Sequence, residues 1–246
     1  YIKDFLYGYN EYARAYLKNE DYNESLKKLN KAYSIDKTYI DTLNNLGYFF
    51  AKNKEPFTES KKAEIQKLYF GEKKAMQGIN TPLDLSINFY RRALLVDREN
   101  ITALVGIGNA YFYQGQYLNA KKYFEDILRI DPDSIAGYSG LLNLYIERDS
   151  FPLTATIHAE LRDKDLLPDL PSPLLSKLAG YYLDKRAKGD SNVRIDYGVT
   201  SPRLIDSSDN LDPAILEVLK ALNKRDPKYP QLYIQFARYH LVKNNL

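Results

Sequence analysis

Cysteine is absent from this sequence of 246 residues. Its absence excludes disulfides, thiolate metal sites and cysteine nucleophiles together. The compartment stays unknown, because a protein of the cytoplasm and one of a bacterial periplasm can both lack cysteine. Histidine is scarce too, since His158 and His240 are the only two. Neither has a neighbouring acidic residue at metal-ligand spacing, so we expect both to be packing residues on helices.

Neither sign of charge dominates the chain. Lysine and arginine number 35 against 32 aspartates and glutamates, the net charge is +3, and no run of five like charges occurs. Such a balance gives a weak field for phosphate backbones, so no nucleic-acid partner is predicted. No apolar stretch is long enough to span a bilayer, so no transmembrane segment is predicted either.

What the sequence does contain is a helical-hairpin pattern between residues 101 and 132. One predicted helix presents large and small residues at helical spacing, namely Leu104, Ile107, Gly108 and Tyr111. A second presents Ala120, Phe124 and Ile127. Gln114 to Gln116 form a turn between them, and Asp131-Pro132 ends the second helix, because proline disfavours helical geometry in the preceding residue.

This order of residues resembles the tetratricopeptide repeat (TPR), whose period is 34 residues. The resemblance implies an all-α fold, a right-handed α-solenoid of helical hairpins that binds other proteins. Laid along the chain, the period predicts about five and a half repeats in a single domain, 1–246, with starts near 6, 40, 101, 135, 172 and 230. Two insertions, about 52–80 and 187–210, interrupt them.

The two insertions differ in character. The first predicts a helix from about Glu59 to Met76 that either decorates the outside of the solenoid or covers a groove as a lid. In the second, apolar and polar residues alternate as in a short strand, with Val193, Ile195, Tyr197 and Val199 on one face. That segment is either a mobile loop or a second contact with a partner.

Sequence motifs for catalysis are missing. Gly106-Ile107-Gly108 imitates the start of a dinucleotide fingerprint, but no strand precedes it and the third glycine is absent. Asp131 to Ser134 lack the remaining ligands of a calcium loop. We therefore predict no catalytic residue, no metal site, no cofactor and no enzymatic activity.

Binding residues are easier to nominate. The resemblance implies that the first helix of each repeat lines a concave groove. The matching positions are Asn10, Arg14, Asn44, Asn45, Tyr48, Asn109, Phe112, Tyr113, Ser139, Asn143, Gln235 and Arg238. An amide side chain both donates to and accepts from an extended peptide, so a row of asparagines can hold one with little regard for its sequence. Alternatively, the asparagines only keep the groove hydrated.

We therefore expect a protein-interaction scaffold or adaptor that binds a partner protein or an extended peptide within a larger bacterial assembly. Two alternatives stay open: a structural subunit that packs into an oligomeric complex, and a small-molecule sensor or enzyme domain with a pocket under the first insertion. Because the chain begins with Tyr1 and its last repeat lacks a second helix, we expect a piece of a longer protein.

Overall fold

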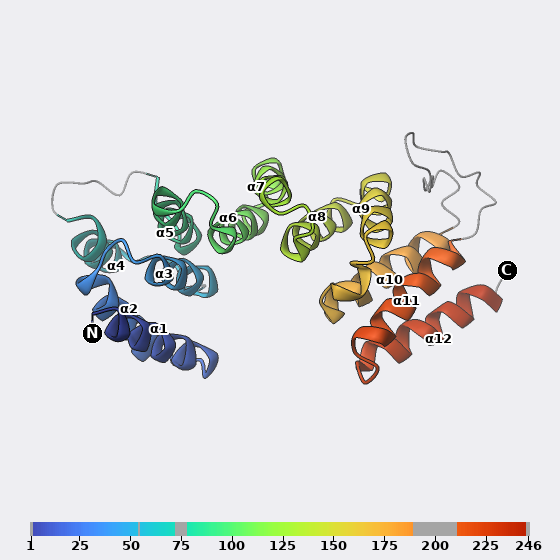
Figure 1. Ribbon diagram of the computed structural model, residues 1–246, viewed down its shortest axis with the longest axis horizontal. Helices are drawn as coiled ribbons and strands as arrows, with labels where there is room; N and C mark the ends of the chain where they lie inside the picture. Colours follow the sequence, from blue (N-terminus) through green and yellow to red (C-terminus); the bar gives the residue numbers. More distant parts are fainter. Residues whose placement is uncertain (1, 54, 72–77, 189–210, 245–246) are drawn as a thin grey trace. The chain divides into compact units, whose positions relative to one another are not determined.

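The computed structural model describes residues 2–53, 55–71, 78–188 and 211–244 (Figure 1). Throughout these ranges the regular structure is helical and contains no strand, which confirms the predicted all-α class. None of the described helices combines the length and the apolar composition that crossing a membrane requires. The chain divides into two compact units, residues 1–130 and 131–246.

Each unit consists of helical hairpins. Unit 1 contains α1 (Ile2–Lys18), α2 (Tyr22–Ile35), α3 (Ile40–Lys52), α4 (Glu59–Ile65), α5 (Pro82–Val96), α6 (Ile101–Tyr113) and α7 (Tyr117–Ile130). Unit 2 contains α8 (Ile135–Glu147), α9 (Phe151–Asp163), α10 (Ser172–Ala187), α11 (Asp212–Arg225) and α12 (Pro230–Asn244). The pairs α1 and α2, α3 and α5, α6 and α7, α8 and α9, and α10 and α11 are in contact. We call α1, α3, α6, α8, α10 and α12 first helices and their partners second helices. The assignment of all repeats to one domain stays a prediction.

The helix that follows the first insertion begins at the capping residues that the sequence indicates. Thr81 Oγ1 accepts a hydrogen bond from the Asp84 amide at 3.2 Å, and the Asp84 carboxylate accepts one from the Thr81 amide at 2.9 Å. This reciprocal capping box satisfies amides that have no partner inside the helix. Pro82 fits the first turn, where a helix needs no amide donor.

Small residues let the helices of unit 1 approach closely. A Cβ atom on Gly108 would lie 2.5 Å from the Phe124 ring of the second helix in the same hairpin. The Tyr90 ring of α5 fills the equivalent space beside Gly47 in α3, where a Cβ would lie 2.8 Å away. The same ring also lies against Gly106 of the next first helix, 2.2 Å from a Cβ there. One tyrosine side chain therefore joins α3, α5 and α6.

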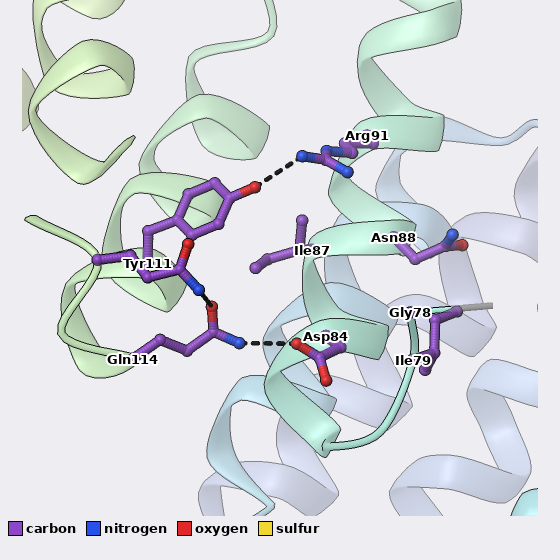
Figure 2. Close-up of a pocket in the computed structure, with 9 residues that line it drawn as sticks. Gly78, Ile79, Asp84, Ile87, Asn88, Arg91, Tyr111 and Gln114 are labelled. Carbon is purple, nitrogen blue, oxygen red and sulfur yellow. Dashed lines mark hydrogen bonds between the residues drawn. The ribbon is translucent and has the colours of Figure 1, made fainter. Parts of the chain in front are cut away.

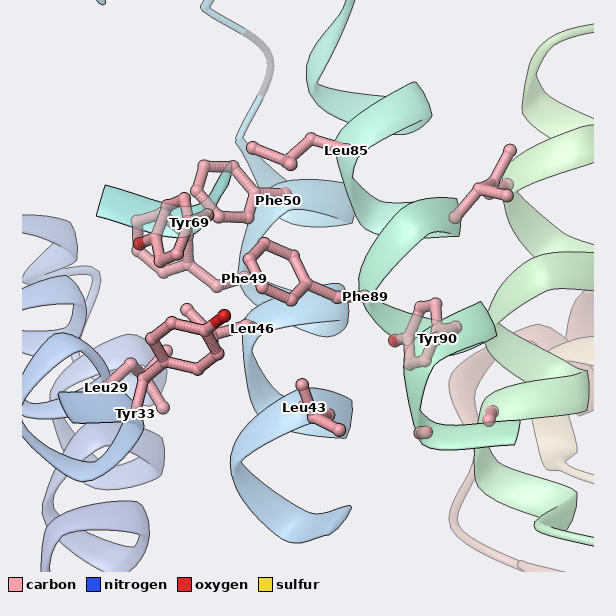
Figure 3. Close-up of a cluster of buried hydrophobic side chains, with 14 of the residues drawn as sticks. Leu29, Tyr33, Leu43, Leu46, Phe49, Phe50, Tyr69, Leu85, Phe89 and Tyr90 are labelled. Atoms are coloured by element: carbon pink, nitrogen blue, oxygen red, sulfur yellow. The ribbon is translucent and has the colours of Figure 1, made fainter. Parts of the chain in front are cut away.

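Aromatic rings fill the core between α2, α3 and α5 (Figure 3). Phe50 and Phe89 stack at 5.8 Å between centroids, and Tyr69 meets Phe89 edge-on at 4.9 Å. Tyr69 comes from the first insertion, and its hydroxyl bonds Asn30 of α2. The insertion is thus an integral part of the core of unit 1.

The helix predicted between Glu59 and Met76 is shorter and less regular than expected. After α4 the chain continues as a π-helix, Gln66–Phe70, and Gly71 with φ of 71° ends it. The wider π turn shifts the side chains, so Ile65 and Tyr69 are buried while Leu68 is 42% exposed. Met76, like the predicted strand residues Val193, Ile195, Tyr197 and Val199, lies outside the described residues.

In unit 2 the connector before α10 contains one turn of 3-10 helix, Leu167–Asp169. Proline is tolerated in the first turn of a helix, and Pro168 is the second residue of this one. Lys185 of α10 is 9% exposed and its ammonium lies 2.8 Å from the Asp149 carboxylate. Arg186 and Asp212 form a second, more buried ion pair between α10 and α11. The first pair joins α10 to the turn between α8 and α9, and the second joins the two helices of one hairpin.

We predict that Gly106→Ala destabilises unit 1. Its Cβ would overlap the rigid Tyr90 ring, and overpacking of this kind costs about 1–3 kcal/mol of unfolding free energy. Gly8→Ala is the matched control, because a Cβ on Gly8 meets no atom within 4 Å. Alanine at position 8 removes the entropic cost of a helical glycine, so it should raise the unfolding free energy by about 0.5–1 kcal/mol. Urea unfolding of both variants measures the two effects, and equal stabilities would contradict the packing described for Tyr90.

Candidate functional site

The first helices of unit 1 lie next to one another, α1 against α3 and α3 against α6. We call the surface they share the first-helix face. Two sets of equivalent positions belong to it, namely Arg14, Tyr48 and Asn109, and Lys18, Lys52 and Tyr113, and Asn45 of α3 lies one turn before Tyr48. This face is where the sequence placed the partner contacts of unit 1.

Asn10 lies beneath this face and joins α1 to α3. Its amide donates to the Leu6 carbonyl and to Thr42 Oγ1, both at 2.8 Å, and its oxygen accepts from Asn45 Nδ2 at 2.8 Å. Only 3% of Asn10 is exposed. The hydrogen-bonding capacity that the sequence assigned to a peptide is therefore used between two helices, while Asn45 remains half-buried at the edge of the face.

Asn44 does the same between α3 and α6. Its amide donates to Asn100 Oδ1 at 3.1 Å, and that oxygen also caps α6 by accepting from the Ala103 amide at 2.9 Å. Asn44 is 8% exposed. Asn10 and Asn44 thus connect the three first helices, because the amide nitrogen of each donates a hydrogen bond to a residue of the next repeat.

The accessible part of the face is aromatic and basic. Tyr48 is 48% exposed and Tyr113 72%. The Lys52 ammonium lies 5.5 Å from the centroid of Tyr48, close enough for a cation–π interaction. Phe112 is half-buried and packs edge-on against Tyr113 at 5.7 Å. Lys18 and Lys52 follow Arg14 and Tyr48 by one helical turn, a spacing that could have identified both lysines from the sequence.

Tyr90 closes the gap between α3 and α6 from below. It is 3% exposed, and burial, with a smaller contribution from Tyr48, raises the pKa of its phenol above the ordinary value. The phenol therefore stays protonated, and its ring forms the floor between Gly47 and Gly106. Sequence reasoning explained Gly108 by packing but left Gly106 without a role.

In unit 2 the nominated residues also connect first helices. Lys177 Nζ donates to Asn143 Oδ1 at 3.2 Å, and Asn143 in turn donates to the Ser139 carbonyl at 3.1 Å. Gln235 donates to the Ser176 carbonyl at 3.3 Å, and Arg238 donates to Gln235 at 3.0 Å and to Asp184 at 2.6 Å. These bonds link α8 to α10 and α10 to α12.

A pocket of about 290 Å³ opens on unit 1 between α5 and α6, next to Gly78 and Ile79 at the end of the first insertion (Figure 2). Gln114 donates to Asp84 at 2.8 Å and Arg91 donates to the Tyr111 hydroxyl at 2.6 Å. Burial would raise the pKa of Asp84, but hydrogen bonds from Asn80, Thr81 and Gln114 outweigh it and lower the pKa. The pocket can hold a small polar ligand by hydrogen bonds.

The two histidines have different surroundings. His158 is 1% exposed, with Nδ1 3.2 Å from the Tyr182 hydroxyl and Nε2 3.4 Å from a Glu217 carboxylate oxygen. Burial, followed by repulsion from Arg162, lowers the pKa of His158 to about 4, so the imidazole is neutral at pH 7 and no ion pair forms. It is a packing residue, as predicted. His240 is exposed on α12, so the packing prediction is wrong for that residue.

The chain is thus a protein of stacked helical hairpins. Residues 101–134 match the tetratricopeptide repeat family, which confirms the resemblance of the central hairpin, and this segment is a tetratricopeptide repeat. No curated protein matches the chain in sequence.

Several solved structures show a weak similarity over most of the chain. YrrB, a TPR protein with an unusual peptide-binding site, is 10% identical, with 92% of this chain and 88% of that one covered and a TM-score of 0.47. A mutant of MamA is 14% identical, with 90% of this chain and 97% of that one covered and a TM-score of 0.46. PilF of Pseudomonas aeruginosa is 13% identical, with 96% of this chain and 98% of that one covered and a TM-score of 0.42. Similarities at this level carry no conclusion about function.

We predict that His158 makes unit 2 sensitive to acid. An unfolded imidazole takes up its proton near pH 6.5, whereas folded His158 does so only near pH 4. Because the unfolded state binds more protons between these values, stability is complete above pH 6.5 and falls by about 3 kcal/mol as the pH drops to 4. Glu217 acts in the opposite direction, because burial raises its pKa.

The comparison of wild type with His158→Gln isolates the histidine. Thermal unfolding between pH 4 and pH 7 should show that wild type loses stability relative to His158→Gln as the pH falls. A difference that stays constant with pH would contradict the lowered pKa.

Proposed function

We propose that this chain is a protein-interaction scaffold or adaptor that binds an extended peptide segment of a partner protein on the first-helix face of unit 1. The observation that carries the proposal is the combination of two exposed tyrosines and three exposed cations on one face. The tetratricopeptide repeat is in general a protein-interaction module, which supports the same function.

Charge favours an acidic peptide. Arg14, Lys18 and Lys52 project from this face, and Arg14 forms an ion pair with Glu11 of the same helix. Lysines on two neighbouring helices leave excess positive charge for a ligand carboxylate. Tyr48 and Tyr113 add rigid aromatic area at low entropic cost, and such area anchors peptides well.

The rigid floor helps binding. Asn10, Asn44 and Tyr90 hold the three first helices at fixed spacing before any ligand arrives. A preformed surface avoids the entropic cost of ordering on binding, so a larger share of the contact energy appears as affinity.

Selection from a random peptide display library tests the ligand class. Wild type should enrich peptides with acidic residues, and their affinity should fall as salt rises, because screening weakens exposed charge pairs. Enrichment of basic or uncharged peptides, or of none, would contradict the proposal.

Two variants test the location. Lys52→Glu should weaken a selected peptide about fivefold to tenfold, which corresponds to about 1 kcal/mol for an exposed charge contact. Tyr113→Ala should weaken binding of the same peptide by about the same factor, because it removes aromatic contact area. Lys27→Glu is the matched control, because the Lys27 side chain is 72% exposed on the second helix α2. Fluorescence anisotropy measures all three, and an equal loss in the control would place the peptide elsewhere.

A further inference from the structure

The first-helix face carries two parallel rows of side chains, and each row takes one residue from α1, α3 and α6. Lys18, Lys52 and Tyr113 form one row, which we call the lysine row, and Arg14, Tyr48 and Asn109 form the other, one helical turn earlier. Both lysines are exposed, and Tyr113 is 72% exposed. A ligand that crosses the three helices therefore meets two cations and then an aromatic ring.

The distance between neighbours in the lysine row follows from the packing of the helices. Helix α1 lies against α3, and Asn10 donates directly to Thr42 Oγ1 at 2.8 Å. Helix α3 lies against α6, and Asn44 donates to Asn100, the capping residue of α6, at 3.1 Å. The axes of helices in direct contact are about 8–10 Å apart. Ligand groups that match the row must therefore recur about every 9 Å.

Of the extended conformations of a peptide, polyproline II matches this distance. It has three residues per turn and a rise of about 3.1 Å per residue, so every third side chain points the same way at intervals of about 9.3 Å. A β-strand presents side chains to one face about every 6.7 Å, and its third residue along points to the opposite face. Polyproline II therefore places successive side chains over Lys18, Lys52 and Tyr113, whereas a strand does not.

The chemistry of the face favours polyproline II for a second reason. A strand gains its affinity from hydrogen bonds along its backbone, whereas the backbone of polyproline II is solvated by water. Two amides that could bond a strand, those of Asn10 and Asn44, are already bonded between the first helices. Tyr48 is 48% exposed one turn before Lys52, where a proline ring can pack on it. Aromatic grooves bind proline-rich segments in this way.

We propose, building on the proposed function, that the peptide bound on the first-helix face is a proline-rich segment in the polyproline II conformation. One acidic residue of the peptide lies opposite Lys18. A second acidic residue, three positions away, lies opposite Lys52, and an apolar residue three positions further on packs against Tyr113.

Two synthetic peptides of identical composition test the spacing. Both contain two glutamates and one tyrosine among prolines; these three residues are three positions apart in the first peptide and two apart in the second. Each is made in both chain directions, and the tighter of each pair is compared by fluorescence anisotropy. The first peptide should bind about fivefold more tightly, because the second aligns one charge fewer with the lysine row.

The outcomes separate this proposal from the proposed function. Equal affinities of the two peptides, or binding of acidic peptides from the display library alone, would overturn the spacing while the proposed function stands. If no acidic peptide binds at all, the proposed function itself fails.

A third peptide tests the conformation. It keeps the three-residue spacing but carries glycine in place of proline, so the charges are the same while the preference for polyproline II is lost. We expect severalfold weaker binding, because the flexible chain has to be ordered on the face. Affinity equal to that of the proline peptide would overturn the polyproline II conformation.

Charge reversal tests the position of each acidic residue. Lys52→Glu should weaken the first peptide, and replacing the middle glutamate of the peptide by lysine should restore the affinity, because the charge pair forms again with opposite sign. Replacing the outer glutamate should not restore it. Lys18→Glu should show the reverse preference. Rescue that does not depend on which glutamate is replaced would overturn the assignment of the two acidic residues to Lys18 and Lys52.

Discussion

The structure of unit 1 depends on one ring placed between two glycines. Tyr90 reaches from α5 to both Gly47 and Gly106, where any Cβ would collide with it. This contact sets the distance between α3 and α6 and the floor of the first-helix face at the same time. Ser86, one turn earlier in α5, donates to the Gly47 carbonyl at 2.7 Å and fixes the same hairpin along its axis.

Polar side chains then convert close packing into a rigid surface. Asn10 and Asn44 are buried amides, and each spans two first helices. Because a buried hydrogen bond is costly to break, these bonds oppose sliding of the helices past one another. The side chains left accessible above them, Tyr48 and Lys52 among others, are displayed on a surface that does not have to form on binding.

The first insertion shows how a repeat accepts extra chain without losing its core. Tyr69 enters the aromatic cluster beside Phe50 and Phe89, and its hydroxyl bonds Asn30. The inserted segment thus adds to the apolar core on the side of α2 and α5, away from the residues of the first-helix face. The pocket at its end, between Asp84 and Arg91, is polar and separate from that face.

The sequence alone determined the helical hairpins, because the repeat period and the order of large and small residues are local properties of the chain. Thr81 to Asp84 likewise marked the start of a helix, because a capping residue, a proline and an acidic residue follow one another there. The sequence could not show that Asn10 and Asn44 face inward, since an amide fits a wet groove and a dry helix contact equally well. Nor could it show that Gly106 makes room for the Tyr90 ring, or that Glu217 lies beside His158. Those facts depend on which distant residue fills each space, and only tertiary packing decides that.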